Sequence, residues 1–256
     1  MTTISDYMTQ KPVCVEAGDP LAKARSLIRK HGYRALPVLH EGKLVGIISR
    51  SDILKVTSSR TNLTVSGLMT ANVAVASPDD ELAKTAKTMV KNEVRQLPVV
   101  KNGGEVIGII SALDILKSFH ESGAKPAKKR VKDVMSKSVV SCSPEDNITK
   151  AWEKMLSSGF SGLPVLEKGK VVGIITRMDL LKHGSARPHI ESGKGRHIPV
   201  RKVMQDRVLT ATPGGSVQDV AGLMVERRII RLPVVDTGMK LAGIVDIEDV
   251  LRAYVP

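Results

Sequence analysis

The chain is poor in aromatic residues, in cysteine and in long apolar runs. Its six aromatic side chains, 2% of 256 residues, are too few for the stacking platforms that bind single-stranded nucleic acid. The two cysteines, Cys14 and Cys142, lie in strand-like stretches, so buried free thiols are expected rather than a disulfide. No apolar run approaches the roughly 18 residues of a membrane-spanning helix, and the first residues are not typical of a signal peptide. We therefore expect a cytoplasmic protein that does not enter a membrane.

The chain also lacks the short motifs of common catalytic sites. It contains no Gly-x-Ser-x-Gly, no phosphate-binding P-loop, no His-Glu-x-x-His and no Cys-x-x-Cys. Its six histidines do not pair recurrently with a carboxylate. His189 and His197 could bind a metal, but a solvated linker is the better interpretation of their segment. We predict that the protein is not an enzyme and holds no metal of its own.

Negative charge is scarce relative to positive charge, and the formal net charge is +13. Much of the excess lies in two connecting segments, Lys125–Arg130 and His183–His197. Such charge favours an anionic partner, which could be a nucleotide, a nucleic acid or an acidic protein surface. A solvated lysine-rich surface explains the charge equally well.

One sequence pattern occurs four times along the chain. Each copy runs from a Met through an apolar stretch and an amphipathic segment to Leu-Pro, and then to Gly-apolar-apolar-polar-x-x-Asp. The period of 61 to 70 residues exceeds that of stacked solenoid repeats, so each copy should be a compact unit that pairs with a neighbour. The Met, Leu-Pro and closing Gly/Asp positions are Met8, Leu36-Pro37 and Gly46/Asp52; Met69, Leu97-Pro98 and Gly108/Asp114; Met135, Leu163-Pro164 and Gly173/Asp179; Met204, Leu232-Pro233 and Gly243/Asp249.

Within each copy the pattern predicts strand, helix, strand, strand and helix. Apolar residues at i, i+3, i+4 and i+7 predict the first helix, and a capping residue before a proline, as in Ser77-Pro78, predicts its start. Glycine-containing turns separate the two strands that follow. One unit of about 55 residues buries too little surface alone, so we predict that copies one and two pair, that copies three and four pair, and that each pair shares a core. The predicted boundaries are 1–60, 61–122, 123–184 and 185–256, with modules 1–122 and 123–256.

This pattern resembles the CBS domain, which occurs in pairs called Bateman modules. The resemblance implies an α+β fold of four βαββα CBS repeats, paired into two pseudo-two-fold Bateman modules. It further implies clefts that bind adenine nucleotides or S-adenosylmethionine-type ligands. The gamma subunit of AMP-activated protein kinase has a similar four-repeat layout. We expect a regulatory sensor with no required cofactor, whose ligand is an adenine nucleotide with or without Mg²⁺. An unidentified effector protein and a homodimer are the other expected partners.

The strongest local signal for binding is the end of the last strand. In three copies a hydroxyl residue precedes the closing Asp by three positions, at the expected start of a helix. The carboxylate could accept hydrogen bonds from a ribose, and the hydroxyl and helix N-terminus could bind phosphate. The same residues could instead only cap the helix. The predicted ribose and phosphate residues are Ser49, Arg50, Asp52, Ser111, Asp114, Thr176, Arg177, Asp179 and Asp249.

The fourth copy departs from this pattern. Asp246 replaces the hydroxyl residue, and Glu248 adds another acid before Asp249. These carboxylates would repel phosphate. We therefore expect a weak or empty site in this copy, or an uncharged or sulfonium-type ligand; a divalent cation is a further alternative.

A second set of positions precedes each Leu-Pro pair, where the resemblance implies a wall of the adenine pocket. An aromatic ring occurs there in copies one and three, and it could stack on a base or pack in the core. A further wall would come from the first strand of each copy. The predicted adenine-cleft residues are Val13, Tyr33, Arg34, Val73, Val94, Arg95, Val139, Phe160, Ser161, Val208, Ile229 and Ile230.

Two alternatives to an adenine-nucleotide sensor stay open. The ligand could be of the S-adenosylmethionine type or a cyclic dinucleotide. The protein could also be a basic scaffold that docks nucleic acid or a partner, although no helix-turn-helix or zinc signature supports this. Arginine follows the hydroxyl residue only in the odd copies, at Arg50 and Arg177, which indicates that a two-copy unit was duplicated.

Overall fold

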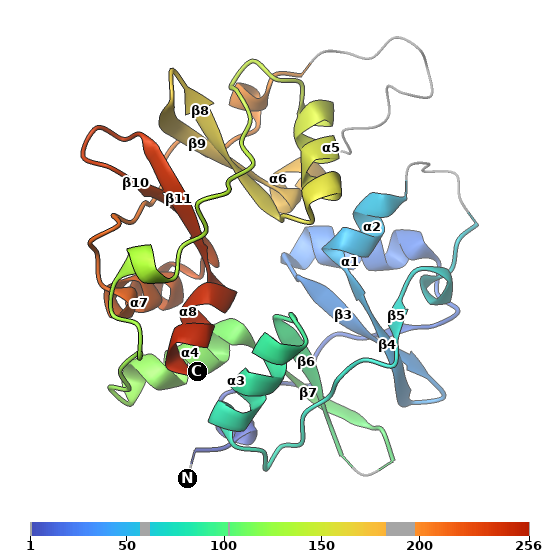
Figure 1. The fold of residues 1–256 in the computed structure, drawn as a ribbon. Helices are drawn as coiled ribbons and strands as arrows, with labels where there is room; N and C mark the ends of the chain where they lie inside the picture. Colours follow the sequence, from blue (N-terminus) through green and yellow to red (C-terminus); the bar gives the residue numbers. More distant parts are fainter. Residues whose placement is uncertain (1, 57–61, 102, 183–197, 256) are drawn as a thin grey trace.

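The computed structural model describes residues 2–56, 62–101, 103–182 and 198–255. It contains the four predicted repeats, each built from a long helix, a β-hairpin and a second helix, arranged around a common centre (Figure 1). The helices are α1 (Leu21–His31), α2 (Arg50–Lys55), α3 (Leu82–Lys91), α4 (Ala112–Glu121), α5 (Ile148–Ser158), α6 (Arg177–Lys182), α7 (Val217–Arg227) and α8 (Ile247–Tyr254).

The strands of each repeat form an antiparallel hairpin whose turn is the predicted glycine-containing one. The hairpins are β3 (Ala35–His40) with β4 (Lys43–Ser49), β6 (Gln96–Val100) with β7 (Val106–Ser111), β8 (Gly162–Glu167) with β9 (Lys170–Thr176), and β10 (Arg231–Val235) with β11 (Leu241–Asp246). The predicted first strand is reduced to β2 (Val15–Glu16) in repeat 1, and to single bridges at Ala76, Cys142 and Ala211 in the other repeats.

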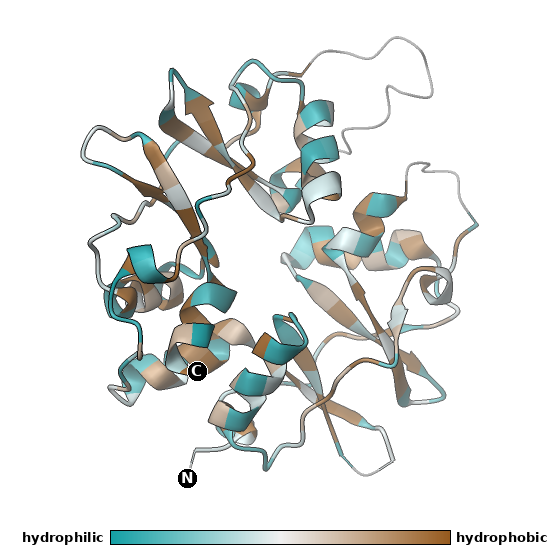
Figure 2. Cartoon of the chain, viewed as in Figure 1, coloured by the Kyte–Doolittle hydropathy of each residue, from teal (hydrophilic) through white to brown (hydrophobic). Residues whose placement is uncertain are grey.

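The long helices bury the predicted stripes. In α5, for example, Ile148, Ala151, Trp152 and Met155 are buried, and Figure 2 shows polar residues on the exposed helix faces. The predicted starts of α3, α5 and α7 are wrong by several residues. In repeat 2, for example, Ser77 and Asp80 close a turn of their own in which the Ser77 amide donates to Asp80 Oδ2 at 2.8 Å. The helix begins only after this turn, at Leu82.

Each repeat gives its first residues to the other repeat of its module. β1 (Thr9–Gln10) pairs with β7 of repeat 2, and β5 (Thr70–Ala71) pairs with β4 of repeat 1. In the second module, bridges join Ser136 to Ile244 and Gln205 to Ile174 in the same way. This exchange joins repeats 1 and 2, and repeats 3 and 4, through their sheets.

The exchange also explains why Met and Gly recur. Met204 lies over Gly173, and a Cβ on that glycine would stand 2.5 Å from the Met204 sulfur. Met135 lies over Gly243 in the same way, with its sulfur 2.9 Å from such a Cβ. Such distances are closer than real Cβ contacts, so a side chain at either glycine would displace the exchanged segment of the neighbouring repeat.

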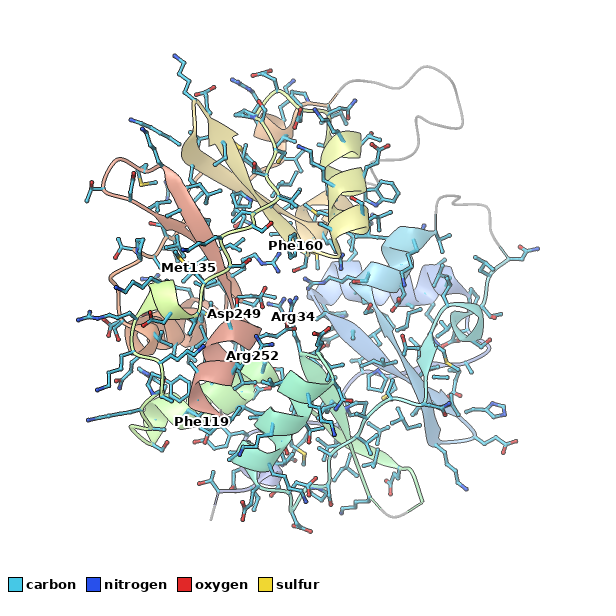
Figure 3. The ribbon with its side chains drawn as sticks, in the orientation of Figure 1. Arg34, Phe119, Met135, Phe160, Asp249 and Arg252 are labelled. Carbon is cyan, nitrogen blue, oxygen red and sulfur yellow. The ribbon has the colours of Figure 1, made fainter. Side chains whose placement is uncertain are left out.

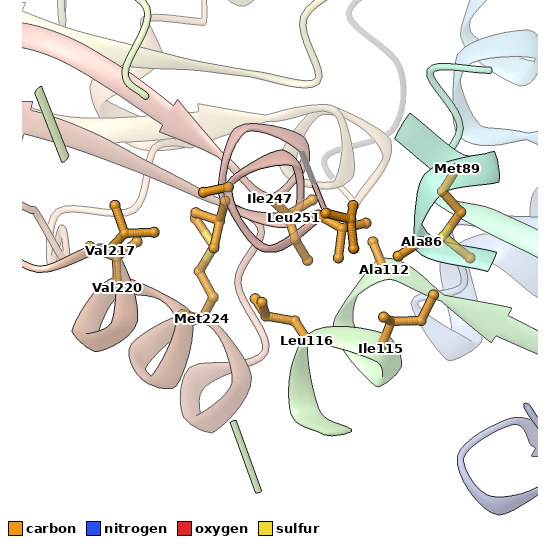
Figure 4. Packing of buried hydrophobic residues seen from close by; sticks show 14 of the residues in the cluster. Ala86, Met89, Ala112, Ile115, Leu116, Val217, Val220, Met224, Ile247 and Leu251 are labelled. Carbon is orange, nitrogen blue, oxygen red and sulfur yellow. The ribbon is translucent and has the colours of Figure 1, made fainter. Parts of the chain in front are cut away.

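The hydrophobic cores divide differently from the prediction. One buried cluster joins repeats 2 and 4 through α3, α4, α7 and α8 (Figure 4). The other joins repeats 1 and 3 and includes buried residues of α1, α2, α5 and α6. The expectation of one shared core per module was therefore wrong, because the helices pack across the two modules while the sheets join the repeats within each module.

Candidate functional site: an arginine-lined central cavity

A cavity of about 810 Å³ lies where the four repeats meet, and every repeat contributes to its wall. Seven arginines line it, against two acids, Glu93 and Glu248. Arg34, which Figure 3 labels near the centre of the molecule, is one of them. The other six are Arg50, Arg95, Arg177, Arg207, Arg228 and Arg231.

The cavity brings together twelve of the predicted site residues. All but Val208 lie at the ends of the strands or in the segments before Leu-Pro, which the hairpins direct toward the centre. These residues are Arg34, Ser49, Arg50, Val94, Arg95, Phe160, Ser161, Thr176, Arg177, Val208, Ile229 and Ile230.

The remaining predicted residues do not line this cavity: Val13, Tyr33, Asp52, Val73, Ser111, Asp114, Val139, Asp179 and Asp249. Val13 is 38% exposed. Tyr33 stacks on His31 with ring centroids 5.2 Å apart. Asp52 and Asp179 are buried immediately behind the lining hydroxyl residues.

The strand-end motif forms a helix cap in all four repeats. Ser49 Oγ donates to Asp52 Oδ2 at 2.6 Å, and the Ser49 amide donates to the same oxygen at 2.9 Å. Ser111 with Asp114, and Thr176 with Asp179, repeat these bonds. One carboxylate oxygen is therefore committed to the cap. The other oxygen accepts from Lys55 Nζ in Asp52 and from Gln205 Nε2 in Asp179, at 3.1 Å in both cases.

Arg50 and Arg177 have structural partners. Arg50 donates from Nε to the Tyr33 carbonyl at 2.6 Å, and also to the Gly32 carbonyl. Arg177 donates from Nη2 to the carbonyls of Met155 at 3.1 Å and Gly159 at 3.0 Å. Each guanidinium thus satisfies carbonyls at the C-terminal end of α1 or α5.

The positive charges in the cavity oppose one another. Burial is the main cause that lowers the pKa of Arg34, and repulsion from Arg95 is the second. Burial, with a smaller contribution from repulsion by Arg34, lowers the pKa of Arg50 to about 10. Both guanidinium groups stay charged at neutral pH, so the cavity carries a positive potential that a bound anion would relieve.

Repeat 4 places its two additional acids against this positive surface. Asp246 Oδ2 accepts from Arg231 Nη2 at 2.5 Å and from Arg95 Nη2 at 3.2 Å. Glu248 Oε1 accepts from Arg95 Nε at 2.8 Å. Burial raises the pKa of Glu248, and Arg95 opposes that shift.

The sequence analysis did not assign Arg207 and Arg228 to the site. A signal for Arg228 exists in the repeat alignment. The turn after the long helix holds Gly32, Glu93, Gly159 and Arg228, all with φ between 53° and 75°. Two repeats use glycine for this left-handed conformation, whereas repeats 2 and 4 place a charged side chain there, and both of these side chains line the cavity.

No group of three or more His, Cys, Asp or Glu side chains in the described part of the chain is placed to hold a metal ion. Nor does any described helix have the length and apolar character needed to cross a membrane. The histidine-containing linker at 183–197 and the boundaries predicted at 60/61 and 184/185 lie outside the described residues.

Comparison with known proteins identifies the repeat. The CBS-domain family model matches residues 4–59, 65–121, 131–186 and 200–256. The chain belongs to the CBS-domain family. All four matches are to this regulatory domain, and they account for both Bateman modules.

Two solved structures cover nearly the whole of this CBS-domain protein. The first is MJ1225 from Methanocaldococcus jannaschii, described as a candidate archaeal homologue of g-AMPK. It has a TM-score of 0.85 at 26% identity and covers 98% of this chain and 99% of that one. In a sequence comparison the same protein is 28% identical over 96% of both chains. The second is a conserved protein from Pyrococcus horikoshii, with a TM-score of 0.70, 28% identity and coverage of 99% and 100%.

A shorter match is the CBS-domain pair of MJ0100, which was solved in complex with 5'-methylthioadenosine and S-adenosyl-L-methionine. It covers 48% of this chain and 98% of that chain, at 31% identity and a TM-score of 0.44.

Proposed function

We propose that this CBS-domain protein is a non-catalytic regulatory protein that binds an adenine nucleotide, with the phosphates in the central cavity. The observation that carries the proposal is the convergence of seven arginines from four repeats on one cavity. Arginine pairs with phosphate through two parallel N–H donors, and it keeps its charge when partly buried.

Three of these arginines are available to a ligand. Arg34, Arg207 and Arg228 line the cavity and form no ion pair with a described residue. Arg228 also holds a left-handed backbone, with φ of 53°, which costs a residue with a Cβ roughly 1–2 kcal/mol.

Two observations support an adenosine group in the ligand: the family to which the chain belongs, and the apolar part of the cavity wall. Phe160, Val208 and Ile229 supply apolar surface beside the hydroxyl residues Ser49 and Thr176. The Phe160 ring is also occupied by the Arg231 guanidinium, 5.2 Å from its centroid. We infer that a base would contact this part of the wall while its ribose lies near the strand ends.

The cavity charge distinguishes among the alternative ligands. The sulfonium of S-adenosylmethionine is a cation, and the arginines disfavour it near the centre, whereas a cyclic dinucleotide shares the phosphate chemistry. Isothermal titration of the full chain with AMP, ADP, ATP, S-adenosylmethionine and cyclic di-AMP separates these cases. We expect the nucleotides to bind, with affinity that falls as salt is raised. No binding by any of the five ligands would overturn the proposal.

The strand-end carboxylates provide the second test. We expect Asp52→Ala and Asp179→Ala each to weaken nucleotide binding by roughly 1–3 kcal/mol, because each acid holds a hydroxyl residue that lines the cavity, Ser49 or Thr176. Asp114→Ala should have a smaller effect, because Ser111 does not line the cavity. Asp249→Ala should have the smallest effect. Titration of each variant, beside its urea midpoint, separates binding from capping. Equal small losses of affinity at all four positions would mean that these acids serve only as helix caps.

Docking of nucleic acid remains the second candidate, because Lys125, Lys128, Lys129 and Arg130 are all exposed. Arg130 already donates to the Gly214 carbonyl at 2.8 Å. Gel shifts that disappear at moderate salt, without sequence preference, would assign this segment to non-specific electrostatic attraction.

A further inference from the structure

Repeat 4 differs from the other three repeats in the residue that caps its second helix. Ser49, Ser111 and Thr176 place a hydroxyl before α2, α4 and α6, and that hydroxyl donates to the Asp of its own cap. Asp246 holds the same position before α8, and its Oδ1 accepts from the Glu248 amide at 3.4 Å. A hydroxyl would satisfy this cap as well, so capping does not explain why repeat 4 carries a carboxylate.

The second oxygen of Asp246 is used by arginines. Oδ2 accepts from Arg231 Nε at 2.9 Å and Nη2 at 2.5 Å, and from Arg95 Nη2 at 3.2 Å. The side chains of Asp246 and Arg231 are 11% and 8% exposed. A pair this buried is screened little by salt, and it occupies the two donors, Nε and Nη2, that Arg231 could otherwise offer to a phosphate.

Glu248 completes the arrangement from the next turn of the chain. It accepts from Arg95 Nε, so the edge of the Arg95 guanidinium formed by Nε and Nη2 faces the two carboxylates of repeat 4. Arg95 belongs to repeat 2 and its remaining nitrogen, Nη1, lies 3.4 Å from Ser161 Oγ of repeat 3. Arg231 Nη1 donates to the Gly162 carbonyl at 2.9 Å. Both arginines line the cavity, but their donors are already engaged.

We propose that Asp246 and Glu248 are internal counter-ions that hold Arg95 and Arg231 away from the ligand and so limit the number of phosphates the cavity accepts. This inference rests on the proposed nucleotide binding. The acids offer carboxylate oxygens where a phosphate would otherwise lie, and they add negative charge that opposes a second or third phosphate. They determine specificity by disfavouring highly charged ligands.

The chain itself supplies the variant that tests this role. Repeat 3 has Thr176 and Met178 at the positions of Asp246 and Glu248, and both line the cavity. Asp246→Thr/Glu248→Met therefore gives repeat 4 the pattern of repeat 3 and keeps a hydroxyl to cap α8. Asp246→Asn/Glu248→Gln is a second variant that keeps the shape of both side chains in case the first is unstable.

The experiment is isothermal titration of the full chain with AMP, ATP and inorganic tripolyphosphate. We expect either double variant to bind ATP and tripolyphosphate at least about tenfold more tightly than the unchanged protein, because two arginines become free. AMP affinity should change by less than about threefold, because the arginines without ion pairs already suffice for one phosphate.

The matched control is Glu153→Gln/Glu226→Gln, which removes two exposed carboxylates on α5 and α7, far from the capping position in sequence. It makes the same change in net charge as the double variants. We expect the affinities for ATP and tripolyphosphate to change by less than about threefold, since exposed charges are screened. If the control tightened ATP binding as much as the double variants, net charge alone would explain the effect and the inference would be wrong.

The failures of the two proposals are distinguishable. If the unchanged protein binds no adenine nucleotide, the proposed function fails, while tripolyphosphate still tests the counter-ions. Equal tripolyphosphate affinity of the unchanged protein and both double variants, in samples shown to be folded by circular dichroism, would overturn the counter-ion role.

Discussion

The two helix interfaces between the modules are built from different chemistry. Between repeats 2 and 4, the first residues of α4 and α8 are Ala112 and Ile247, which are 2% and 0% exposed and belong to the hydrophobic cluster. Between repeats 1 and 3, the same positions of α2 and α6 hold Arg50 and Arg177. Arg177 crosses to the neighbouring repeat and donates to Ser51.

The difference explains the odd and even alternation of the sequence. An arginine at the start of the short helix reaches back to the carbonyl end of the long helix and leaves a charged rim at the cavity. An apolar residue there closes the interface instead. One interface thus serves mainly for packing, whereas the other is partly assigned to the cavity.

The largest expected effect comes from placing the arginine of repeats 1 and 3 in the interface between repeats 2 and 4. Ile247→Arg would bury a guanidinium among apolar side chains of α3, α4 and α7, where the carbonyls at the end of α7 are its expected partners. We expect a loss of about 4 kcal/mol in the free energy of unfolding, because a buried charge without an acidic partner is strongly destabilising. Urea denaturation measures it, and Ile247→Val, a control that removes one methyl group, should cost only about 1 kcal/mol. Similar losses in the two variants would show that this interface tolerates charge.

The reverse exchange should cost less. Arg177→Met removes the bonds to the Met155 and Gly159 carbonyls, and we expect a loss of about 2 kcal/mol. Arg50→Met, at a more exposed position, should cost about 1 kcal/mol. The urea midpoints of the two variants rank them. A stabilised Arg177→Met protein would contradict the assigned capping of α5 and show that the arginine is kept for the cavity.

A smaller effect is the pH dependence of stability that Glu248 of repeat 4 causes. Because burial raises the pKa of Glu248, the folded state holds this proton more tightly than the unfolded state. The resulting stabilisation is complete below the unfolded pKa and disappears as the pH rises through the folded value. We therefore expect Glu248→Gln to gain stability relative to the unchanged protein between pH 4 and pH 7, as measured by thermal unfolding. A difference that does not change with pH would mean that Arg95 fully compensates burial.

The smallest effect is a difference in thiol reactivity. Burial raises the pKa of Cys142, in the cluster shared by repeats 1 and 3, to about 11. Burial also raises the pKa of the half-buried Cys14. We expect iodoacetamide at pH 8 to modify Cys14 first and Cys142 only after unfolding, as followed by mass spectrometry. Equal rates in the folded protein would show that the odd interface opens readily.

The repeat made much of the fold predictable. The stripe of α5 and the hairpin turns follow from local periodicity, which each copy samples independently. The exchange of first residues between repeats, and the division of the core across modules, depend on contacts between distant segments. No local pattern distinguishes Met204 over its own sheet from Met204 over Gly173, so the sequence could not reveal this exchange.

The sequence indicated which segments meet at the cavity, but not the role of each residue. Phe160, Arg34 and Arg95 line the central cavity, whereas their alignment indicated adenine clefts within each module, and their binding of adenine stays a prediction. Arg50 and Arg177 were assigned to phosphate, yet they donate to backbone carbonyls, because the helix ends beside them were not visible in the sequence. Asp246 was expected to repel phosphate. The structure shows it paired with Arg231 of its own repeat and Arg95 of repeat 2, a partnership that needs tertiary structure to be found.

The exchanged segments have a consequence for synthesis of the chain on the ribosome. Repeat 1 receives β5 from the start of repeat 2, so its sheet stays incomplete until those residues have emerged from the exit tunnel. The segment containing Met8 must wait longer, because its partner strand β7 ends at Ser111. Nascent chains therefore acquire their native sheets two repeats at a time, and a stall within a module would leave an unpaired strand edge exposed to chaperones and proteases.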